Sequence, residues 1–265
     1  MSKPVILFIV EGKSRDCRFV KEMTTCFFKG HYSSKIICLP AAQNLYMLYQ
    51  KLEEDDFETD VVEVLKETVK DARIELSNIK RQEISEVYLF FDFDVHQNNT
   101  SDAMPCDSEI MKKMLKFFDN ETENGRLYIS YPMVEALYDY RDGTCKAFSN
   151  CYVSLKSCGQ YKNLSGKNNP KACQRMDIAH WHEILNVFSL RVQCLFKKST
   201  VDLNWYRETV SPESIYNAER EIFKRHNSIF VLSAFPEFLF DNFKEEFWNS
   251  MSKQKNKKFN NCRKK

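Results

Sequence analysis

The sequence lacks several features that would assign it quickly to a class of protein. Its ten cysteines include no C-x-x-C pair, so the closely spaced thiols of a structural zinc site are missing. It has no apolar stretch approaching the ~20 residues that a membrane-spanning helix needs, and its opening, Met1-Ser2-Lys3, shows no signal-peptide pattern. We therefore expect a cytoplasmic protein with reduced thiols and no membrane partner.

A phosphate-binding loop is also missing, although Gly12-Lys13-Ser14 looks like the end of one. Such a loop needs a glycine five residues before Gly12, because its backbone curls round the phosphates, and Leu7 stands there. What the sequence does contain is an apolar run, Val5 to Val10, that leads directly into Glu11. A carboxylate therefore stands at the end of a predicted buried strand.

Acidic residues are absent from two parts of the chain. None occurs between Asp142 and Asp177, and none occurs in the last thirteen residues, KQKNKKFNNCRKK, which carry seven bases. Each part either contacts a polyanion or is a solvated flexible segment. In the first part, the bases that we expect to contact nucleic acid are Lys162, Lys167 and Lys171. Tyr152 and Tyr161 either stack on bases or belong to an ordinary surface loop.

The first half of the chain alternates strand and helix patterns. Apolar strands are predicted at 5–10, 35–39, 87–91 and 127–131. Helical patterns separate them, at 17–28, 45–52, 61–76 and 107–118. Four apolar strands separated by helices indicate an α/β fold with a parallel sheet that helices cover on both faces.

The second half is predicted to be mainly helical. Apolar residues at spacings of three and four predict a long amphipathic helix from Ile178 to Leu195, followed later by a strand at 228–235 and a helix that Pro236 opens. We therefore expect an α/β metal-binding domain at 1–142, a mobile basic insertion at 143–176, and a helical region with one late strand and a basic tail at 177–265.

Four carboxylates are predicted to meet at one edge of the sheet. Glu11 follows the first strand and Asp92 and Asp94 follow the third, so right-handed crossovers bring all three to the edge where parallel sheets bind ligands. Glu135, in the first turns of a helix after the fourth strand, is expected to join them. Such carboxylates repel one another unless a cation neutralises them, and oxygen ligands suit Mg²⁺ or Mn²⁺. The alternative is that these acids cap helices or solvate loops.

These motifs resemble a TOPRIM domain over roughly residues 3–140: a strand ending in Glu11-Gly12, a helix, and a later strand ending in Asp92-Phe93-Asp94. TOPRIM domains occur in topoisomerases, primases, OLD-family nucleases and RloB-type effectors of phage defence. The resemblance implies a Rossmann-like sheet in which Glu11, Asp92 and Asp94 hold Mg²⁺ and Glu135 completes a second metal position. One departure concerns the loop after Asp94, where VHQNN replaces the glycine of many members.

The resemblance implies a metal-dependent nuclease that cleaves the phosphodiesters of DNA or RNA, including tRNA, as an antiviral effector acting with a partner ATPase. Lys13, Arg15 and Arg18, shortly after Glu11, either contact phosphates or are ordinary solvated bases. A second class of function stays open, in which the same fold binds nucleic acid or a partner protein without catalysis and the acids serve only the structure. The sequence predicts no oligomeric state.

Overall fold

The structure is a computed structural model, and it describes residues 3–28, 32–40, 44–93, 109–139, 151–168 and 175–243. Some of the predicted functional residues therefore lie outside the described residues, namely Asp94, Lys171 and the basic tail. Lys167 is described as part of a helix, without its side chain.

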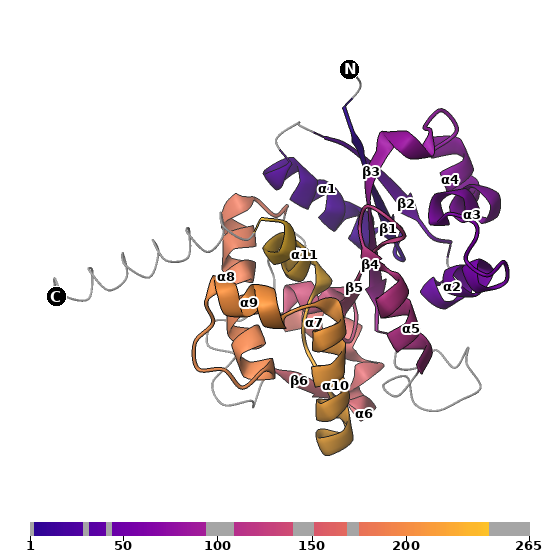
Figure 1. Ribbon diagram of the computed structural model, residues 1–265. Helices are drawn as coiled ribbons and strands as arrows, with labels where there is room; N and C mark the ends of the chain where they lie inside the picture. The colour runs from indigo at the N-terminus through magenta and orange to yellow at the C-terminus, as the bar shows by residue number, and fades with distance from the viewer. Residues whose placement is uncertain are drawn as a thin grey trace.

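A five-stranded sheet forms the centre of the molecule, with the strand order β2-β1-β3-β5-β4 (Figure 1). Four strands are parallel: β1 (Val5–Val10), β2 (Ser33–Cys38), β3 (Ile84–Asp92) and β5 (Gly125–Ser130). The two-residue strand β4 (Asp119–Asn120) pairs antiparallel with β5 at one edge. The predicted α/β fold with a parallel sheet is thus confirmed, and only the short antiparallel edge strand was not foreseen.

The two faces of the sheet carry different kinds of apolar side chain, because successive residues of a strand point to opposite faces. One face is aromatic and packs against Phe238, whose ring lies within 6 Å of four others: Phe8, Tyr88, Phe90 and Tyr128. The alternate positions are mainly aliphatic and fully buried: Leu7, Ile9, Leu89 and Leu127. Because both faces carry large buried side chains, the central sheet is part of the hydrophobic core on both sides.

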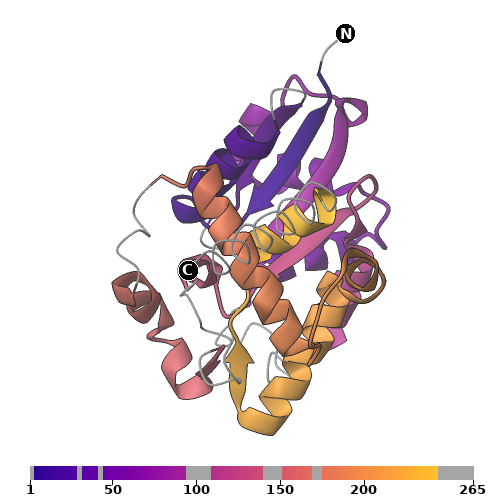
Figure 2. The same ribbon diagram turned by 90° about the vertical axis from the view of Figure 1, so that its left-hand side faces the viewer.

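Helices cover both faces of the sheet. One layer consists of α1 (Arg15–Phe27), α8 (Ile178–Leu195) and α11 (Ala234–Asn242), and Figure 2 shows α8 and α11 in front of the strands. The other layer consists of α2 (Leu45–Glu53), α3 (Val61–Thr68), α4 (Lys70–Glu75) and α5 (Glu109–Phe117). The continuous helix predicted over 61–76 is wrong in one respect, because Val69 has extended backbone angles and separates α3 from α4.

The chain after β5 forms a second, smaller layer that contains a 3-10 helix, a two-stranded sheet and further helices. The 3-10 helix η3 (Val134–Tyr138) follows β5, and β6 (Tyr152–Ser154) pairs antiparallel with β7 (Ser228–Phe230). The remaining helices are α6 (Leu155–Cys158), α7 (Tyr161–Asn168), α9 (Leu203–Thr209) and α10 (Pro212–His226). A short 3-10 helix, η1 (Arg81–Glu83), precedes β3.

The prediction of a mobile loop at 143–176 is wrong for residues 151–168, which form a strand and two helices. Tyr161 is buried and its hydroxyl donates to Asp139 Oδ2 at 3.3 Å, so it does not offer a stacking surface. Tyr152 is exposed. The late strand is also shorter than predicted, because β7 ends at Phe230 and α11 already begins at Ala234, two residues before Pro236.

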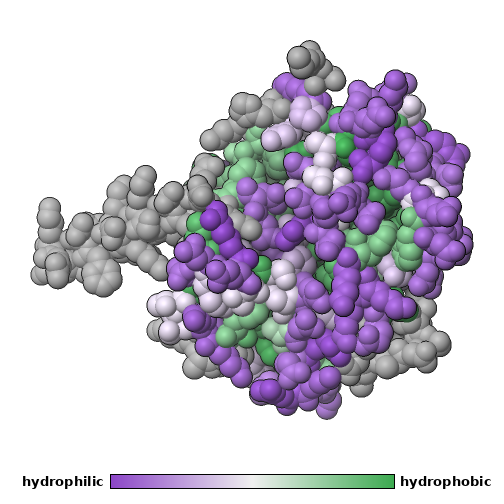
Figure 3. Space-filling view, viewed as in Figure 1, coloured by the Kyte–Doolittle hydropathy of each residue, from purple (hydrophilic) through white to green (hydrophobic). Residues whose placement is uncertain are grey.

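One hydrophobic core joins the first half of the chain to the last helix. Buried residues from Val5 in β1 to Phe240 in α11 belong to a single cluster, so the core crosses the boundaries predicted at 142 and 176. Hydrophilic side chains cover most of the face shown in Figure 3, with hydrophobic ones in small areas between them. Within the described part of the chain, no helix has both the length and the apolar character needed to cross a membrane.

Candidate functional site

The carboxyl ends of β1 and β3 bring two of the predicted ligands into contact. Asp92 is the last residue of β3 and Glu11 directly follows β1, its neighbour in the sheet. The backbone N–H of Asp92 donates to Glu11 Oε2 at 3.3 Å, and Asp92 Oδ1 accepts a hydrogen bond from the backbone N–H of Val134 at 2.7 Å. Both side chains are half-buried. The carboxylate of Glu11 therefore lies against the backbone of Asp92 at this edge of the sheet, while a metal site shared by the two carboxylates stays a prediction.

A small cavity of about 10 Å³ adjoins this contact. It lies where the carboxyl edge meets α2 and α5, and its lining consists of Glu11, Asn44, Leu45, Tyr46, Phe91, Asp92, Met111 and Ile129. A space of this size holds about one water molecule. Glu11 and Asp92 thus border a small hollow at the edge of the sheet whose other lining residues are mostly apolar.

Glu135 reaches the same edge from η3, but it already has a cationic partner. It is only 3% exposed, and Arg15 of α1 forms an ion pair with its Oε1. Arg18 is also held internally, because its Nη2 donates to the hydroxyl of Tyr138 at 2.6 Å. Arg15 and Arg18 therefore fix η3 against α1, while their side chains stay 39% and 35% exposed.

Asp16 is a member of this acidic edge that the sequence analysis missed. It lies in the first turn of α1 and is buried, with its carboxylate folded over Gly12, where the β-carbon of any other residue would collide with Oδ2. The pKa of Asp16 is raised to about 7, mainly by burial and also by the nearby Glu11, while its own backbone N–H and Arg15 oppose the shift. The glycine after Glu11 therefore leaves room for a carboxyl group that is partly protonated near neutral pH.

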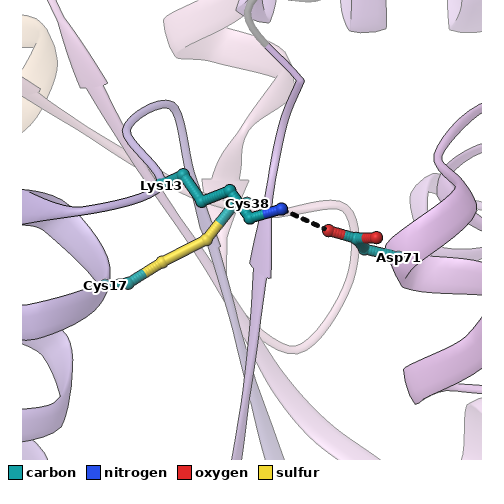
Figure 4. Close-up of a disulfide and its surroundings, with 4 residues drawn as sticks. All are labelled: Lys13, Cys17, Cys38 and Asp71. Carbon is teal, nitrogen blue, oxygen red and sulfur yellow. Dashed lines mark hydrogen bonds and ion pairs between the residues drawn. A yellow bond between two sulfur atoms is a disulfide. The ribbon is translucent and has the colours of Figure 1, made fainter.

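The predicted nucleic-acid-binding lysines differ in their surroundings. Lys13 is 81% exposed and forms a 3.3 Å ion pair with Asp71 (Figure 4). Lys162 is exposed on α7. Exposed bases of this kind are free to contact a polyanion, although Lys13 would have to exchange one acidic partner for another.

Cys17 and Cys38 form a disulfide beside Lys13 (Figure 4). It joins the start of α1 to the end of β2, next to the segment that carries Glu11 and Asp16. The expectation that all thiols are reduced is therefore wrong for this pair. Within the described part of the chain, four other cysteines are not part of a disulfide: Cys26, Cys151, Cys158 and Cys194.

The oxygen ligands at the edge fit Mg²⁺ or Mn²⁺ by their chemistry but do not form a complete protein cage. Among the described residues, no group of three or more His, Cys, Asp or Glu is arranged to hold a metal ion. Mg²⁺ is usually held by one or two carboxylates together with water and substrate phosphates. The pair Glu11 and Asp92 meets that smaller requirement.

A second group of acids lies away from this edge, between α11 and the aromatic face of the sheet. Arg126 of β5 donates to Asp241 Oδ2 at 3.0 Å, and the hydroxyl of Tyr128 donates to the same oxygen at 3.1 Å. Glu237, one turn earlier on α11, is fully buried. Burial and then the nearby Asp241 raise the pKa of Glu237 well above its ordinary value, although Arg126 opposes the shift.

Comparison with known proteins adds no assignment to this geometry. No family model matches the chain, and no curated protein and no solved structure match it.

Proposed function

We propose that this protein is a divalent-metal-dependent nuclease of the TOPRIM type that hydrolyses phosphodiester bonds at the carboxyl edge of its sheet. The observation that supports the proposal most directly is the contact between Glu11 and Asp92 at the ends of two adjacent parallel strands. Ligands of open α/β sheets bind at this edge. Two carboxylates placed there have the chemistry of a site for Mg²⁺ or Mn²⁺.

Each acid of the edge has its own part in this proposal. Glu11 and Asp92, with Asp94 as the sequence predicts, would hold the ion, which when bound activates water and stabilises the leaving oxygen. Asp16 keeps a proton near neutral pH and so lowers the negative charge beside Glu11 while the edge holds no cation. Glu135 remains a predicted ligand of a second metal position, and it would have to exchange Arg15 for the ion.

The biological setting rests on the sequence resemblance alone. It includes DNA or RNA, with tRNA among the candidates, as the substrate, a role in antiviral defence and a partner ATPase. The exposed Lys13 and Lys162 are suited to contact the phosphates of such a substrate.

A non-catalytic module is the second candidate, and two contacts favour it. Asp92 Oδ1 is held by the backbone N–H of Val134, and Glu135 is neutralised by Arg15. Acids with such partners can have a purely structural role, which is to position η3 against the sheet. In this reading the fold binds nucleic acid or another protein without cleaving it.

Cleavage assays separate the two candidates. We expect the purified protein to cleave at least one of 5′-labelled single-stranded DNA, duplex DNA and tRNA in Mg²⁺ or Mn²⁺, and none of them in a chelator. Glu11→Gln and Asp92→Asn should each lower the rate by more than about a hundredfold, since even outer partners of metal ligands affect activity by 10- to 100-fold. Glu83→Gln, at the opposite end of β3 in η1, is the matched control and should cleave normally.

Two results would contradict the nuclease proposal. Full cleavage by the Glu11→Gln, Asp92→Asn double variant would remove the carboxyl edge from the chemistry. Absence of cleavage of all three substrates in both metals, by protein that still binds one of them, would favour the non-catalytic module.

A further inference from the structure

A groove of about 500 Å³ lies at the other end of the smaller layer, where β6, α10 and the end of α8 meet. Its lining consists of Tyr152, Leu195, Lys197, Ala218, Glu221, Ile222, Arg225 and His226. Figure 1 places α10 and β6 together in the lower part of the molecule. The volume is within the range of roughly 300–1,000 Å³ that is typical of ligand sites. None of the candidate metal ligands lines this groove.

The groove offers a flat aromatic surface beside an apolar one. Tyr152 is 40% exposed, and its ring lies nearly parallel to the ring of His226, with an interplanar angle of 14° and 6.3 Å between the centroids. Leu195 and Ile222 supply apolar surface from α8 and α10. Exposed, nearly parallel rings are suited to stack against a planar ligand.

The charged side chains of the groove favour an anion. Lys197 and Arg225 are positive, whereas Glu221 is the one acid in the lining. Glu221 holds Arg225 through a 3.2 Å ion pair to Nη2, which leaves the other donors of the guanidinium available. Lys197, just past the end of α8, forms no ion pair within the described part of the chain. The lining therefore combines an excess of positive charge with stacking surface.

We propose that this groove binds one nucleotide unit of a single-stranded nucleic acid. The base stacks on Tyr152 and His226, and a neighbouring phosphate contacts Lys197 and Arg225. Proteins that bind single strands combine stacking aromatic side chains with basic groups along the backbone in this way. The chain's own basic tail does not suit the groove, because its seven bases would meet Lys197 and Arg225. The inference goes beyond the proposed cleavage, since binding here needs neither the metal nor the carboxyl edge.

Fluorescence anisotropy with labelled (dT)₁₂, in a chelator and at fixed salt, tests the proposal on the full chain. Tyr152→Ala should weaken binding about five- to a hundredfold, the effect expected for one stacked base, whereas Tyr152→Phe should bind as the wild type does. Tyr32→Ala is the matched control, because Tyr32 is 42% exposed and lies before β2. It should leave the affinity unchanged. The melting temperature of each variant shows whether it is folded.

The charged residues give a second, independent measurement. Lys197→Gln and Arg225→Gln should each reduce the salt dependence of (dT)₁₂ binding, by a slope of about 0.7 for each phosphate that the protein no longer neutralises. Lys51→Gln, which removes an exposed ion pair with Glu54 in α2, is the control and should keep the slope. Asp92→Asn should also bind (dT)₁₂ normally, so failure of the nuclease proposal and failure of this one give different results.

Three outcomes would overturn the proposal. The first is wild-type affinity in folded Tyr152→Ala together with an unchanged salt slope in Lys197→Gln and Arg225→Gln. The second is displacement of (dT)₁₂ by AMP at an equal nucleotide concentration, which would assign the groove to a free nucleotide. The third is equal displacement by a peptide of glutamates, which would show that charge alone determines binding.

Discussion

Two acidic clusters of this protein differ in what surrounds them. At the carboxyl edge, Glu11 and Asp92 are half-buried, and their backbone and side-chain contacts hold them beside a small cavity. Under α11, Glu237 and Asp241 lie against the aromatic face, with Arg126 as their cation. A cation from solvent can reach the half-buried carboxylates at the strand ends. The carboxyl groups between α11 and the sheet are buried, so their cation has to be a side chain of the protein.

Each cluster contains an arginine, and the two arginines differ in how exposed they are to solvent. Arg126 serves the buried acids of α11, whereas Arg15 is 39% exposed and binds Glu135 at the rim of the candidate site. A desolvated charge is costly when its partner is removed, while water can replace a partner at an exposed position. The comparison therefore predicts that the same type of substitution has different effects at the two places.

The largest effect is expected from Arg126→Leu, which leaves the buried side chain of Asp241 without its cation. Removing one partner of a buried pair costs about 3–5 kcal/mol, and we expect the lower end of that range. Arg15→Leu should cost somewhat less, since Arg15 is 39% exposed and Arg126 is 26% exposed, although it too leaves a buried acid, Glu135, without its cation. Urea unfolding of the two variants in a chelator measures the difference, and equal losses would show that the two clusters do not differ in solvation.

The second prediction concerns the buried acid Glu237, whose raised pKa makes stability depend on pH. The unfolded chain releases this proton near pH 4.5, whereas the folded protein keeps it, so the folded state binds more protons above that pH. Stability therefore falls as pH rises from about 4.5 towards the folded pKa, by about 1.4 kcal/mol for each pKa unit. Glu237→Gln should remove this loss and be more stable than the wild type at pH 8, with no difference at pH 4.

Urea unfolding between pH 4 and pH 8 checks this prediction. Glu208→Gln is the control, since Glu208 is exposed at the end of α9, and it should follow the wild-type curve. A Glu237→Gln variant that is less stable than the wild type at pH 8 would show that the folded protein holds the carboxylate in its charged form.

The contrast between the clusters also explains which parts of the site the sequence predicted. Glu11 and Asp92 were predictable because each ends an apolar strand, and the right-handed parallel topology brings such ends to one edge. The bounds of β1 were predicted without error for the same reason, since all six of its residues are apolar and buried. An apolar run is a local signal in the sequence, and the bounds of β1 and the residues at the strand ends can be predicted from such signals.

The features that the sequence did not predict depend on contacts between distant segments. Arg15 and Glu135 are 120 positions apart, and nothing local to either residue indicates their ion pair. Asp16 is buried only because Gly12 leaves space for it. The strand β6 forms where an acid-free segment suggested a loop, because it pairs with β7, far along the chain. Likewise, spacing between cysteines gave no indication that Cys17 and Cys38 would meet.

The third prediction concerns Asp16, the titrating member of the carboxyl edge. Its pKa of about 7, against 3.8 in the ordinary case, means that the folded protein binds more protons than the unfolded chain between about pH 4 and pH 7. Stability falls with rising pH through that window. Asp16→Asn cannot ionise, so in a chelator it should be more stable than the wild type at pH 8 and equal at pH 3.5. The effect should be smaller than that of Glu237→Gln, because the pKa of Asp16 rises only to about 7, whereas full burial raises the pKa of Glu237 well above its ordinary value. Guanidinium unfolding at the two pH values measures this difference in stability. If Asp16→Asn and the wild type are equally stable at pH 8, Asp16 does not carry the raised pKa.

The smallest expected effect is stabilisation of the carboxyl edge by Mg²⁺, which bears on the central difference between the two clusters. A ligand that binds only the folded state at ten times its dissociation constant stabilises by about 1.4 kcal/mol, equivalent to roughly 3–6 °C in the melting temperature of a chain of this size. Glu11→Gln and Asp92→Asn should lose this shift, because each removes the carboxylate of one of the two acidic residues that line the same cavity. Glu237→Gln should keep it, because the carboxyl group of Glu237 is buried between α11 and the sheet. Thermal melts with and without Mg²⁺, with Ca²⁺ as a second ion, separate the variants.

If Glu237→Gln loses the shift and Asp92→Asn keeps it, the accessible cluster is not where the ion binds. A shift of equal size in Asp92→Asn and the wild type would show that stabilisation by Mg²⁺ does not depend on the carboxyl edge.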